Sequence, residues 1–342
     1  MRAFITGVAG PALTDAERRF IREAEPWGLI LFKRNVADPG SVRGLIDAFR
    51  AAAGWQAPVL IDQEGGRVQR LGPPHWPSYP PGAAYGAVYD RRRDTGLAAA
   101  KLGARLIAAD LAALGIDVDC APIADVPVAG ADPVIGDRAY GTEPAKVAAL
   151  AGAFAAGLLE GGVLPVLKHI PGHGRATADS HEKLPVVNAE QATLKTSDFA
   201  AFRPLAALPL GMTAHVVFTA FDRVAPATTS ATIVRDVIRD SIGFAGLLMS
   251  DDISMGALSG SLAERTAAAI AAGCDMVLHC NGKMPEMLAV AAAAPQLAGE
   301  AARRAAGALA LRKPAAPIDA AASRAEFFKL MAGAWQPAPG SA

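Results

Sequence analysis

Short apolar runs alternate with longer Ala-rich stretches eight times along this chain of 342 residues. Each run is continuously apolar, which is typical of a parallel strand buried on both faces. Eight βα units in succession predict an α/β fold, a single (β/α)8 TIM-type barrel in which some helices are irregular or missing. The expected strands cover residues 4–8, 29–32, 58–61, 116–120, 164–167, 210–214, 247–250 and 276–279.

Helices are expected between these strands, and the chain after the eighth strand is short. The expected helices cover residues 15–25, 41–53, 95–114, 144–160, 190–207, 233–241 and 262–272. The Ala- and Pro-rich tail after Pro314 holds one expected helix, at 324–332, and is too small for a second domain. We therefore expect one catalytic barrel domain over 1–342, with 313–342 as a short C-terminal extension.

Charge and cysteine content narrow the class of protein. The formal net charge is +0, from 33 basic and 33 acidic residues, which predicts neither a nucleic-acid nor a membrane partner. The three cysteines, Cys120, Cys274 and Cys280, are too few for a disulfide framework and favour a reducing compartment. Gly7 and Gly10 interrupt the first apolar run early, unlike a signal peptide. A soluble cytoplasmic protein is expected, with no predicted oligomeric state.

Titratable side chains follow six of the expected strands. They are Asp62, Asp119, Asp125, Lys168, His169, His215, Asp251, Asp252 and His279. Because the active site of this fold lies at the carboxyl ends of its strands, these side chains predict a pocket at the barrel mouth. Asp62 alone is equally consistent with a helix cap, and His279 is expected to be a core histidine. Lys168 needs a carboxylate or a polyhydroxy ligand, because a lone buried ammonium is costly.

Four segments carry more specific motifs. They are LFKRN at 31–35, IDQEGGRVQRL at 61–71, KHIPGHGRATADSHEKLP at 168–185 and MSDDISM at 249–255, with weaker support from GDRAYG at 136–141. Together they resemble the glycoside hydrolase family 3 β-N-acetylhexosaminidases, in the single-domain bacterial form used in peptidoglycan recycling. The motifs span most of the barrel in the order expected of that family.

The resemblance implies a retaining, exo-acting β-N-acetylglucosaminidase that releases N-acetylglucosamine from peptidoglycan-derived anhydro-muropeptide fragments. Asp251 matches the nucleophile that forms a covalent glycosyl–enzyme. His181 matches the general acid/base, and Asp179 matches its partner carboxylate. The positions that match sugar-binding residues are Asp62, Arg70, Arg138, Lys168 and His169. No metal or organic cofactor is implied.

The chemistry of these residue types agrees with the implied roles. A histidine suits both proton donation and proton uptake, since its unperturbed pKa is close to neutral. Asp251 must stay ionised, and a nearby cation would lower its pKa, for which Lys168 and Arg138 are candidates. The loop 171–181 contains Gly172 and Gly174, so we expect it to be mobile and to close over bound sugar. The chain has no room for the carboxy-terminal sandwich domain of some relatives, so the acid must come from the barrel.

Three alternatives remain open at this point. A metal-dependent barrel hydrolase is one, with His169, His173, His181 and Asp179 as ligands. A barrel that binds sugars without catalysing a reaction is the second. In the third, the substrate's own acetamido group attacks in place of Asp251.

Overall fold

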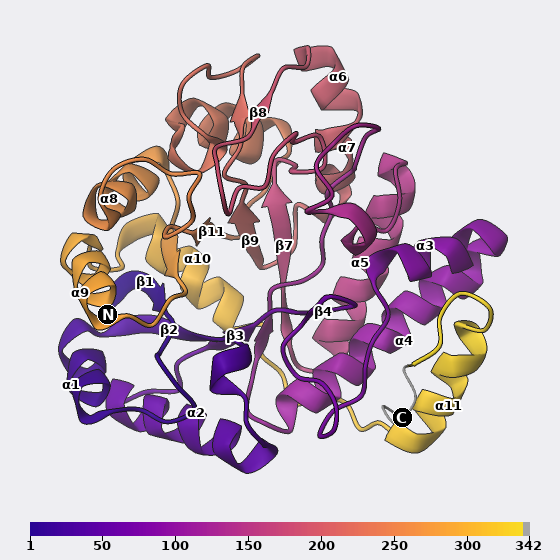
Figure 1. Cartoon of the computed structure of the whole chain (residues 1–342), viewed down its shortest axis with the longest axis horizontal. Helices are drawn as coiled ribbons and strands as arrows, with labels where there is room; N and C mark the ends of the chain where they lie inside the picture. Colours follow the sequence, from indigo (N-terminus) through magenta and orange to yellow (C-terminus); the bar gives the residue numbers. More distant parts are fainter. Residues whose placement is uncertain (338–342) are drawn as a thin grey trace.

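The computed structural model describes residues 1–337, and over these residues eight parallel strands close into a barrel (Figure 1). In chain order they are β1 (Arg2–Thr6), β2 (Pro26–Leu31), β3 (Val59–Ile61), β6 (Val118–Asp119), β7 (Leu164–Ile170), β9 (Leu210–Thr213), β11 (Leu247–Asp252) and β12 (Met276–His279). Each strand pairs with the next, and β12 pairs with β1. The predicted (β/α)8 fold is confirmed, and every expected strand overlaps an observed one.

The strands are apolar throughout because both of their faces are buried. On β2, Ile30 belongs to the cluster inside the barrel, while Leu29 and Leu31 pack outward against the helices. The register pairs Ile30 with Leu60 of β3, so inward side chains lie in layers. Alternate side chains of a strand point to opposite faces, and a residue after a strand end therefore faces the barrel mouth only when its position has the right parity.

Helices surround the barrel, with two exceptions. They are α1 (Asp15–Ala24), α2 (Pro39–Ala53), α3 (Gly82–Arg91), α4 (Arg93–Ala112), α5 (Pro144–Glu160), α6 (Gln191–Thr196), α7 (Asp198–Phe202), α8 (Leu262–Ala272), α9 (Met284–Ala293), α10 (Gly299–Leu309) and α11 (Ala320–Leu330). The exceptions are α10, which lies across the amino end of the barrel, and α11, which packs against α4. The helix at Ile233–Ser241 is of π type. Reciprocal capping by Thr14 and Glu17 begins α1.

The expected single helix at 190–207 is interrupted. Ser197 has φ −115° and ψ −84°, which ends α6 and begins α7. The Ser197 hydroxyl donates to the Thr193 carbonyl at 2.7 Å, and the Asp198 carboxylate binds Arg175 at 2.9 Å. Arg175 belongs to the loop after β7, so the interruption fastens that loop to the helical layer.

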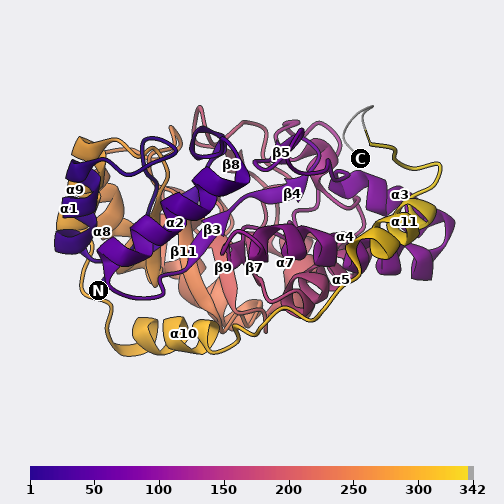
Figure 2. The same cartoon turned by 90° about the horizontal axis from the view of Figure 1, so that it is seen from below.

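Two short pairs of strands lie at the carboxyl ends of the barrel strands. β4 (Gln63–Gly65) and β5 (Val68–Gln69) form an antiparallel hairpin directly after β3. β8 (Val186–Val187) pairs with β10 (Val217–Phe218), which joins the loops after β7 and β9. Both pairs lie on the side of the barrel opposite α10 (Figure 2).

The amino end of the barrel is closed by α10. Ala305 and Ala308 of this helix belong to the same apolar cluster as the inward side chains of the strands. Arg304 anchors the helix through Asp275, at 2.8 Å. Within residues 1–337, α10 thus covers the amino end of the barrel, and the end where the strands finish is open.

The segment after α10 runs along the outside of the barrel to α11, which lies against α4 (Figure 2). Arg324 binds Asp110 at 2.9 Å, and Phe327 is 2% exposed. Residues 338–342 of the expected extension at 313–342 lie outside the described residues. Among residues 1–337, no helix is both long enough and apolar enough to cross a bilayer.

Candidate active site

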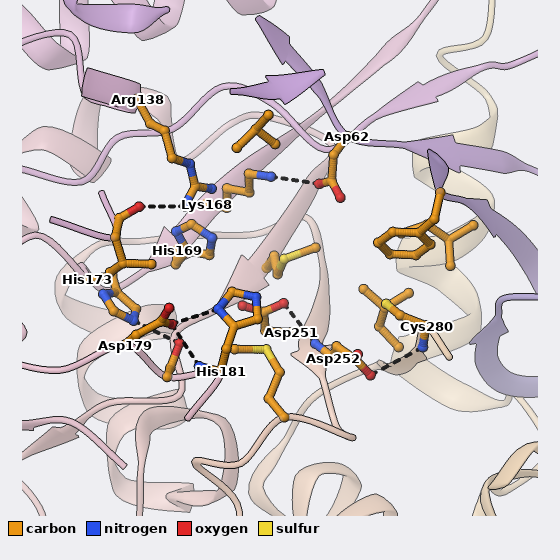
Figure 3. A pocket seen from close by; sticks show the side chains of 18 of the residues that line it. Asp62, Arg138, Lys168, His169, His173, Asp179, His181, Asp251, Asp252 and Cys280 are labelled. Atoms are coloured by element: carbon orange, nitrogen blue, oxygen red, sulfur yellow. Dashed lines mark hydrogen bonds and ion pairs between the residues drawn. The ribbon is translucent and has the colours of Figure 1, made fainter. Parts of the chain in front are cut away.

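A cavity of about 390 Å³ opens at the carboxyl ends of the barrel strands (Figure 3). Ile30, Met212 and Leu278 contribute apolar side chains from the barrel interior to its lining. All eight site residues expected from the sequence line this cavity: Asp62, Arg70, Arg138, Lys168, His169, Asp179, His181 and Asp251. The fold thus brings together residues that are up to 189 positions apart in the chain.

Lys168 lies at the centre of a buried ionic cluster. Its side chain is 2% exposed, and its Nζ is 2.9 Å from Asp62 Oδ1 and 2.7 Å from Glu64 Oε1. Burial by itself would lower the pKa of Lys168, but the two carboxylates raise it well above its ordinary value. Arg70 binds the second oxygen of Asp62 at 2.9 Å. Although burial opposes it, the charges of Lys168 and Arg70 hold the pKa of Asp62 far below its usual range.

Glu64 completes this cluster, and the sequence assigned no role to it. Arg138 donates to both oxygens of Glu64, at 2.8 and 2.9 Å. Burial would raise the pKa of Glu64, but Arg138 and Lys168 lower it to about 2. The signal that identifies Glu64 is its spacing from Asp62, because residues i and i+2 of an extended segment share one side.

Asp251 lies at the end of β11 and keeps its charge. Its Oδ1 accepts the Asp252 N–H at 2.8 Å. Burial would raise the pKa of this carboxyl, but the neighbouring His169 and His215, the Asp252 N–H and then Lys168 lower it below its ordinary value. Of the two candidate cations, Lys168 does lower this pKa. Two imidazoles contribute more than Lys168, and Arg138 is bound by Glu64.

The neighbouring carboxylate, Asp252, has a structural role in the turn that follows β11. Its oxygens accept the backbone N–H of Ser254 at 3.0 Å, the Ser254 hydroxyl at 2.7 Å and the Cys280 N–H at 3.2 Å. These bonds tie the end of β11 to the end of β12. Two adjacent acids thus have different surroundings, and Asp251 is the one with accepting capacity left for chemistry.

His169 is oriented by a buried carboxylate. Its Nδ1 is 2.7 Å from Asp125 Oδ2, which leaves Nε2 for a ligand. Burial would raise the pKa of Asp125, but the charge and hydrogen bond of His169 lower it. The other oxygen of Asp125 accepts the His173 N–H at 2.6 Å. Asp125 therefore fixes both histidines, a role that its place after the fourth strand did not indicate.

His181 and Asp179 form a hydrogen-bonded pair on the cavity wall. His181 Nδ1 is 2.7 Å from Asp179 Oδ1, and the same oxygen accepts the His181 N–H at 2.9 Å. The imidazole is 66% exposed, so it can exchange protons with water. Burial opposes the shift, but the hydrogen bonds from His181 lower the pKa of Asp179, which keeps a negative charge beside the ring.

Glycine is required at two positions of the loop 171–181, at Gly172 by the backbone conformation and at Gly174 by close packing. Gly172 has φ +139°, a conformation that residues with a Cβ rarely adopt. A Cβ on Gly174 would lie 2.3 Å from the Val126 carbonyl atoms, and Val128 N–H donates to the Gly174 carbonyl at 3.2 Å. In this arrangement the loop is fastened at several points, and its closure over sugar stays a prediction.

Four of the expected strand-end residues do not line the cavity: His279, His215, Asp119 and Asp125, the last of which fixes His169 and His173 from behind. His279 is buried as expected, with Nε2 3.0 Å from Glu286. His215 is also buried, between Thr228 and the Asp252 carbonyl. Asp119 lies in the core, where it accepts the Gln63 N–H at 3.0 Å. The convergence predicted from six strand ends therefore holds for three of them, those of β3, β7 and β11.

The three histidines of the metal-site alternative each face a different partner. His169 binds Asp125, His173 binds Ser180 at 3.0 Å and His181 binds Asp179. Within residues 1–337, no three or more His, Cys, Asp or Glu side chains are grouped to hold a metal ion. The donor geometry therefore gives this alternative no support.

Comparison with known proteins connects this site to a family. The family described as Glycosyl hydrolase family 3 N terminal domain matches residues 6–306. A β-hexosaminidase of Alkalilimnicola ehrlichii is 40% identical over 80% of this chain and 79% of its own length. A β-hexosaminidase of Chromobacterium violaceum is 39% identical over 84% and 82%, respectively.

Solved structures agree with these sequence relatives. NagZ from Neisseria gonorrhoeae, in complex with N-trifluoroacetyl-D-glucosamine, has a TM-score of 0.86 at 28% identity, covering 97% of this chain and 98% of that one. A glycoside hydrolase family 3 β-N-acetylglucosaminidase from a Paenibacillus species has a TM-score of 0.83 at 30% identity, covering 96% of this chain and 66% of that one. The chain therefore belongs to glycosyl hydrolase family 3 and is a glycosidase.

Proposed function

We propose that the protein is a retaining, exo-acting β-N-acetylglucosaminidase that releases N-acetylglucosamine from peptidoglycan-derived anhydro-muropeptide fragments in the cytoplasm. The observation that carries the proposal is that an ionised Asp251 and the Asp179–His181 pair line one cavity. Retaining hydrolysis needs a nucleophile and a proton donor at the same glycosidic bond. We further propose that 1–342 is a single catalytic domain, with 313–342 as its extension.

In the first step, an Asp251 oxygen attacks the anomeric carbon and forms a glycosyl ester. The bond to the leaving oxygen breaks, and protonated His181 gives its proton to that oxygen. The charge of Asp179 stabilises the imidazolium form before the transfer. In the second step, neutral His181 takes a proton from water as the water oxygen attacks the anomeric carbon. The ester bond breaks and frees the Asp251 carboxylate, so the product keeps the β configuration.

The ionic cluster supplies the contacts that hold the sugar ring. Asp62, Arg70, Arg138, Lys168 and His169 present both donors and acceptors to the cavity, which suits the hydroxyls and the acetamido-bearing ring. Asp62 binds Arg70 and Lys168, Glu64 binds Arg138, and Asp125 binds His169, so these side chains are held in place before a ligand binds. The cavity of about 390 Å³ is in the range of small-ligand sites, which favours removal of one terminal sugar.

The comparisons support the choice of sugar. Curated relatives bear the name β-hexosaminidase, and the similar Neisseria gonorrhoeae protein was solved with an N-acylated glucosamine. An aryl β-glycoside panel that differs only at the second carbon of the sugar tests this point. The N-acetylglucosaminide is expected to be turned over well ahead of the glucoside, and equal rates would contradict the assignment.

A 5-fluoro N-acetylglucosaminyl fluoride tests the mechanism. It should trap a covalent adduct that mass spectrometry of the digested protein maps to Asp251. An adduct on another residue would overturn the assignment of the nucleophile. Turnover without any adduct would instead favour attack by the substrate's acetamido group.

A further inference from the structure

The loop that carries His181 is fastened directly to the loop that follows the nucleophile strand. Gly256 N–H donates to the His181 carbonyl at 3.1 Å, and Ala257 N–H donates to the Ser180 carbonyl at 3.1 Å. Gly256 and Ala257 follow β11, which ends with Asp251 and Asp252. The two halves of the proposed catalytic machinery therefore contact each other through their main chains.

Gly256 permits this contact because it has no side chain. A Cβ at this position would lie 2.7 Å from the Glu182 carbonyl oxygen and 2.8 Å from the His181 carbonyl oxygen. Gly256 is not among the glycines with positive φ, so the close approach, rather than the backbone conformation, requires glycine here. Both obstructing atoms belong to the main chain, and a side-chain rotation cannot relieve the overlap. A larger residue must displace the backbone that carries His181.

A second contact holds the same loop from the β7 side. Ser180 is 3% exposed, and its hydroxyl is 3.0 Å from His173 Nε2. His173 is itself fixed, since its N–H donates to buried Asp125 at 2.6 Å. The peptide between Ser180 and His181 is therefore held on two sides, whereas the hydrogen bond to Asp179 orients the imidazole ring (Figure 3).

We propose that His173, Gly256 and Ala257 form a seat for the His181 loop, and that Gly256 is a positioning residue for the general acid. The inference rests on the proposed role of His181 as proton donor. A main-chain shift of a few tenths of an ångström at His181 moves the imidazole relative to the leaving oxygen. Proton transfer is sensitive to such misplacement, whereas attack by Asp251 is not directly affected.

The test compares leaving groups in a Gly256→Ala variant. We expect kcat/KM for phenyl β-N-acetylglucosaminide, which needs a proton donor, to fall by about tenfold or more. For the 2,4-dinitrophenyl glycoside, which needs little protonation, kcat/KM should stay within about threefold. Gly307→Ala is the matched control, because a Cβ on this exposed α10 glycine meets no atom within 4 Å. The control should leave both values unchanged.

Equal losses on both substrates would overturn the inference, because they would report a general disturbance of the fold or cavity. An unchanged rate on the phenyl glycoside would overturn it as well. Ser180→Ala is the second variant and removes only a hydroxyl, so it decides the question if Gly256→Ala fails to give a cooperative thermal transition. It should show the same dependence on the leaving group, with a smaller loss.

A His181→Ala variant separates this inference from the proposed function. If His181→Ala slows both substrates equally, the acid/base assignment fails. If His181→Ala discriminates between the leaving groups but Gly256→Ala and Ser180→Ala do not, the seat alone fails.

Discussion

Asp179 accepts two hydrogen bonds from His181 at a single oxygen, one from the ring at 2.7 Å and one from the backbone at 2.9 Å. The two hydrogen bonds fix the orientation of the imidazole that, in the proposed reaction, gives a proton to the leaving group. We predict that Asp179→Asn, which removes the carboxylate charge but keeps the shape of the side chain, impairs proton donation by His181. On the phenyl glycoside, kcat/KM at neutral pH should fall by about tenfold or more.

Measurement on the 2,4-dinitrophenyl glycoside supplies the control for Asp179→Asn, since the loss there should be small. A uniform loss on both substrates would contradict the predicted role of Asp179.

Removal of the proposed nucleophile should stop turnover without unfolding the protein. We predict that Asp251→Ala lowers kcat by about 10⁴-fold or more, because it removes the nucleophile. The fold should persist, because the carboxylate contributes to it through one hydrogen bond, from the Asp252 N–H. Azide added with an activated substrate should give the glycosyl azide of inverted configuration, detectable by proton magnetic resonance.

The adjacent acid is the matched comparison for Asp251. Asp252→Asn should retain turnover but lower the free energy of unfolding by about 1–3 kcal/mol, since it weakens bonds to Ser254 and Cys280. If Asp252→Asn abolishes turnover while Asp251→Ala retains it, the two roles are reversed.

Glu64 should link stability to pH. Its pKa is about 2 in the folded protein, against an ordinary 4.5, so the unfolded chain takes up the proton at a higher pH than the folded chain. The stabilisation from this carboxylate is therefore complete above about pH 5 and is lost as the pH falls toward 2. We predict that Glu64→Gln lowers the free energy of unfolding by roughly 3 kcal/mol at pH 7, and by progressively less in acid.

Urea denaturation at several pH values between 3 and 7 measures this difference. Glu326→Gln, at an exposed position on α11, is the control and should follow the wild-type curve. A stability gap for Glu64→Gln that stays constant with pH would contradict the assignment.

The α11 segment should stabilise the barrel without taking part in the reaction. Phe327 is 2% exposed and packs beside Tyr85, Phe328 and Trp335. We predict that Phe327→Ala lowers the free energy of unfolding by about 3–5 kcal/mol and leaves kcat/KM of the folded enzyme unchanged. Lys329→Ala, on the exposed side of the same helix, should change neither quantity. A change in kcat/KM for Phe327→Ala would place this segment in communication with the cavity.

Chelation tests the remaining metal-dependent alternative. Because the histidines of the site face separate partners, we expect full activity after exhaustive dialysis against a chelator. A loss of activity that a divalent cation restores would favour the alternative.

The sequence predicted the eight strands because both faces of each are buried, which makes their apolar runs continuous. Which polar residues reach the cavity was harder to predict. Asp62, Lys168 and Asp251 each follow an inward residue by two positions, namely Leu60, Val166 and Met249. Asp119 and His279 have the opposite parity and face the outer layer. Which side chains point inward depends on the exact end and register of each strand in the closed barrel, and the sequence pattern does not specify these.

Other features depend on tertiary contacts that local patterns do not encode. The sequence predicts one helix over 190–207, but it is interrupted at Ser197, next to Asp198, which binds the distant Arg175. Glu64 lies within a recognised motif, but its importance comes from Arg138 and Lys168, which are far away in the chain. The order of the motifs was sufficient for the family, whereas the partners of each side chain required the fold.

Because α10 covers the amino end of the barrel, ligands reach the cavity in the described part of the chain from the carboxyl ends of the strands. In the proposed reaction this sets the order of product release: the leaving group leaves the cavity first, and the sugar, which is bound deepest, leaves last. Water for the second step must enter through the space that the leaving group has just vacated. A bulky leaving group that dissociates slowly from the cavity opening would therefore delay both its own release and the entry of the water that hydrolyses the glycosyl ester.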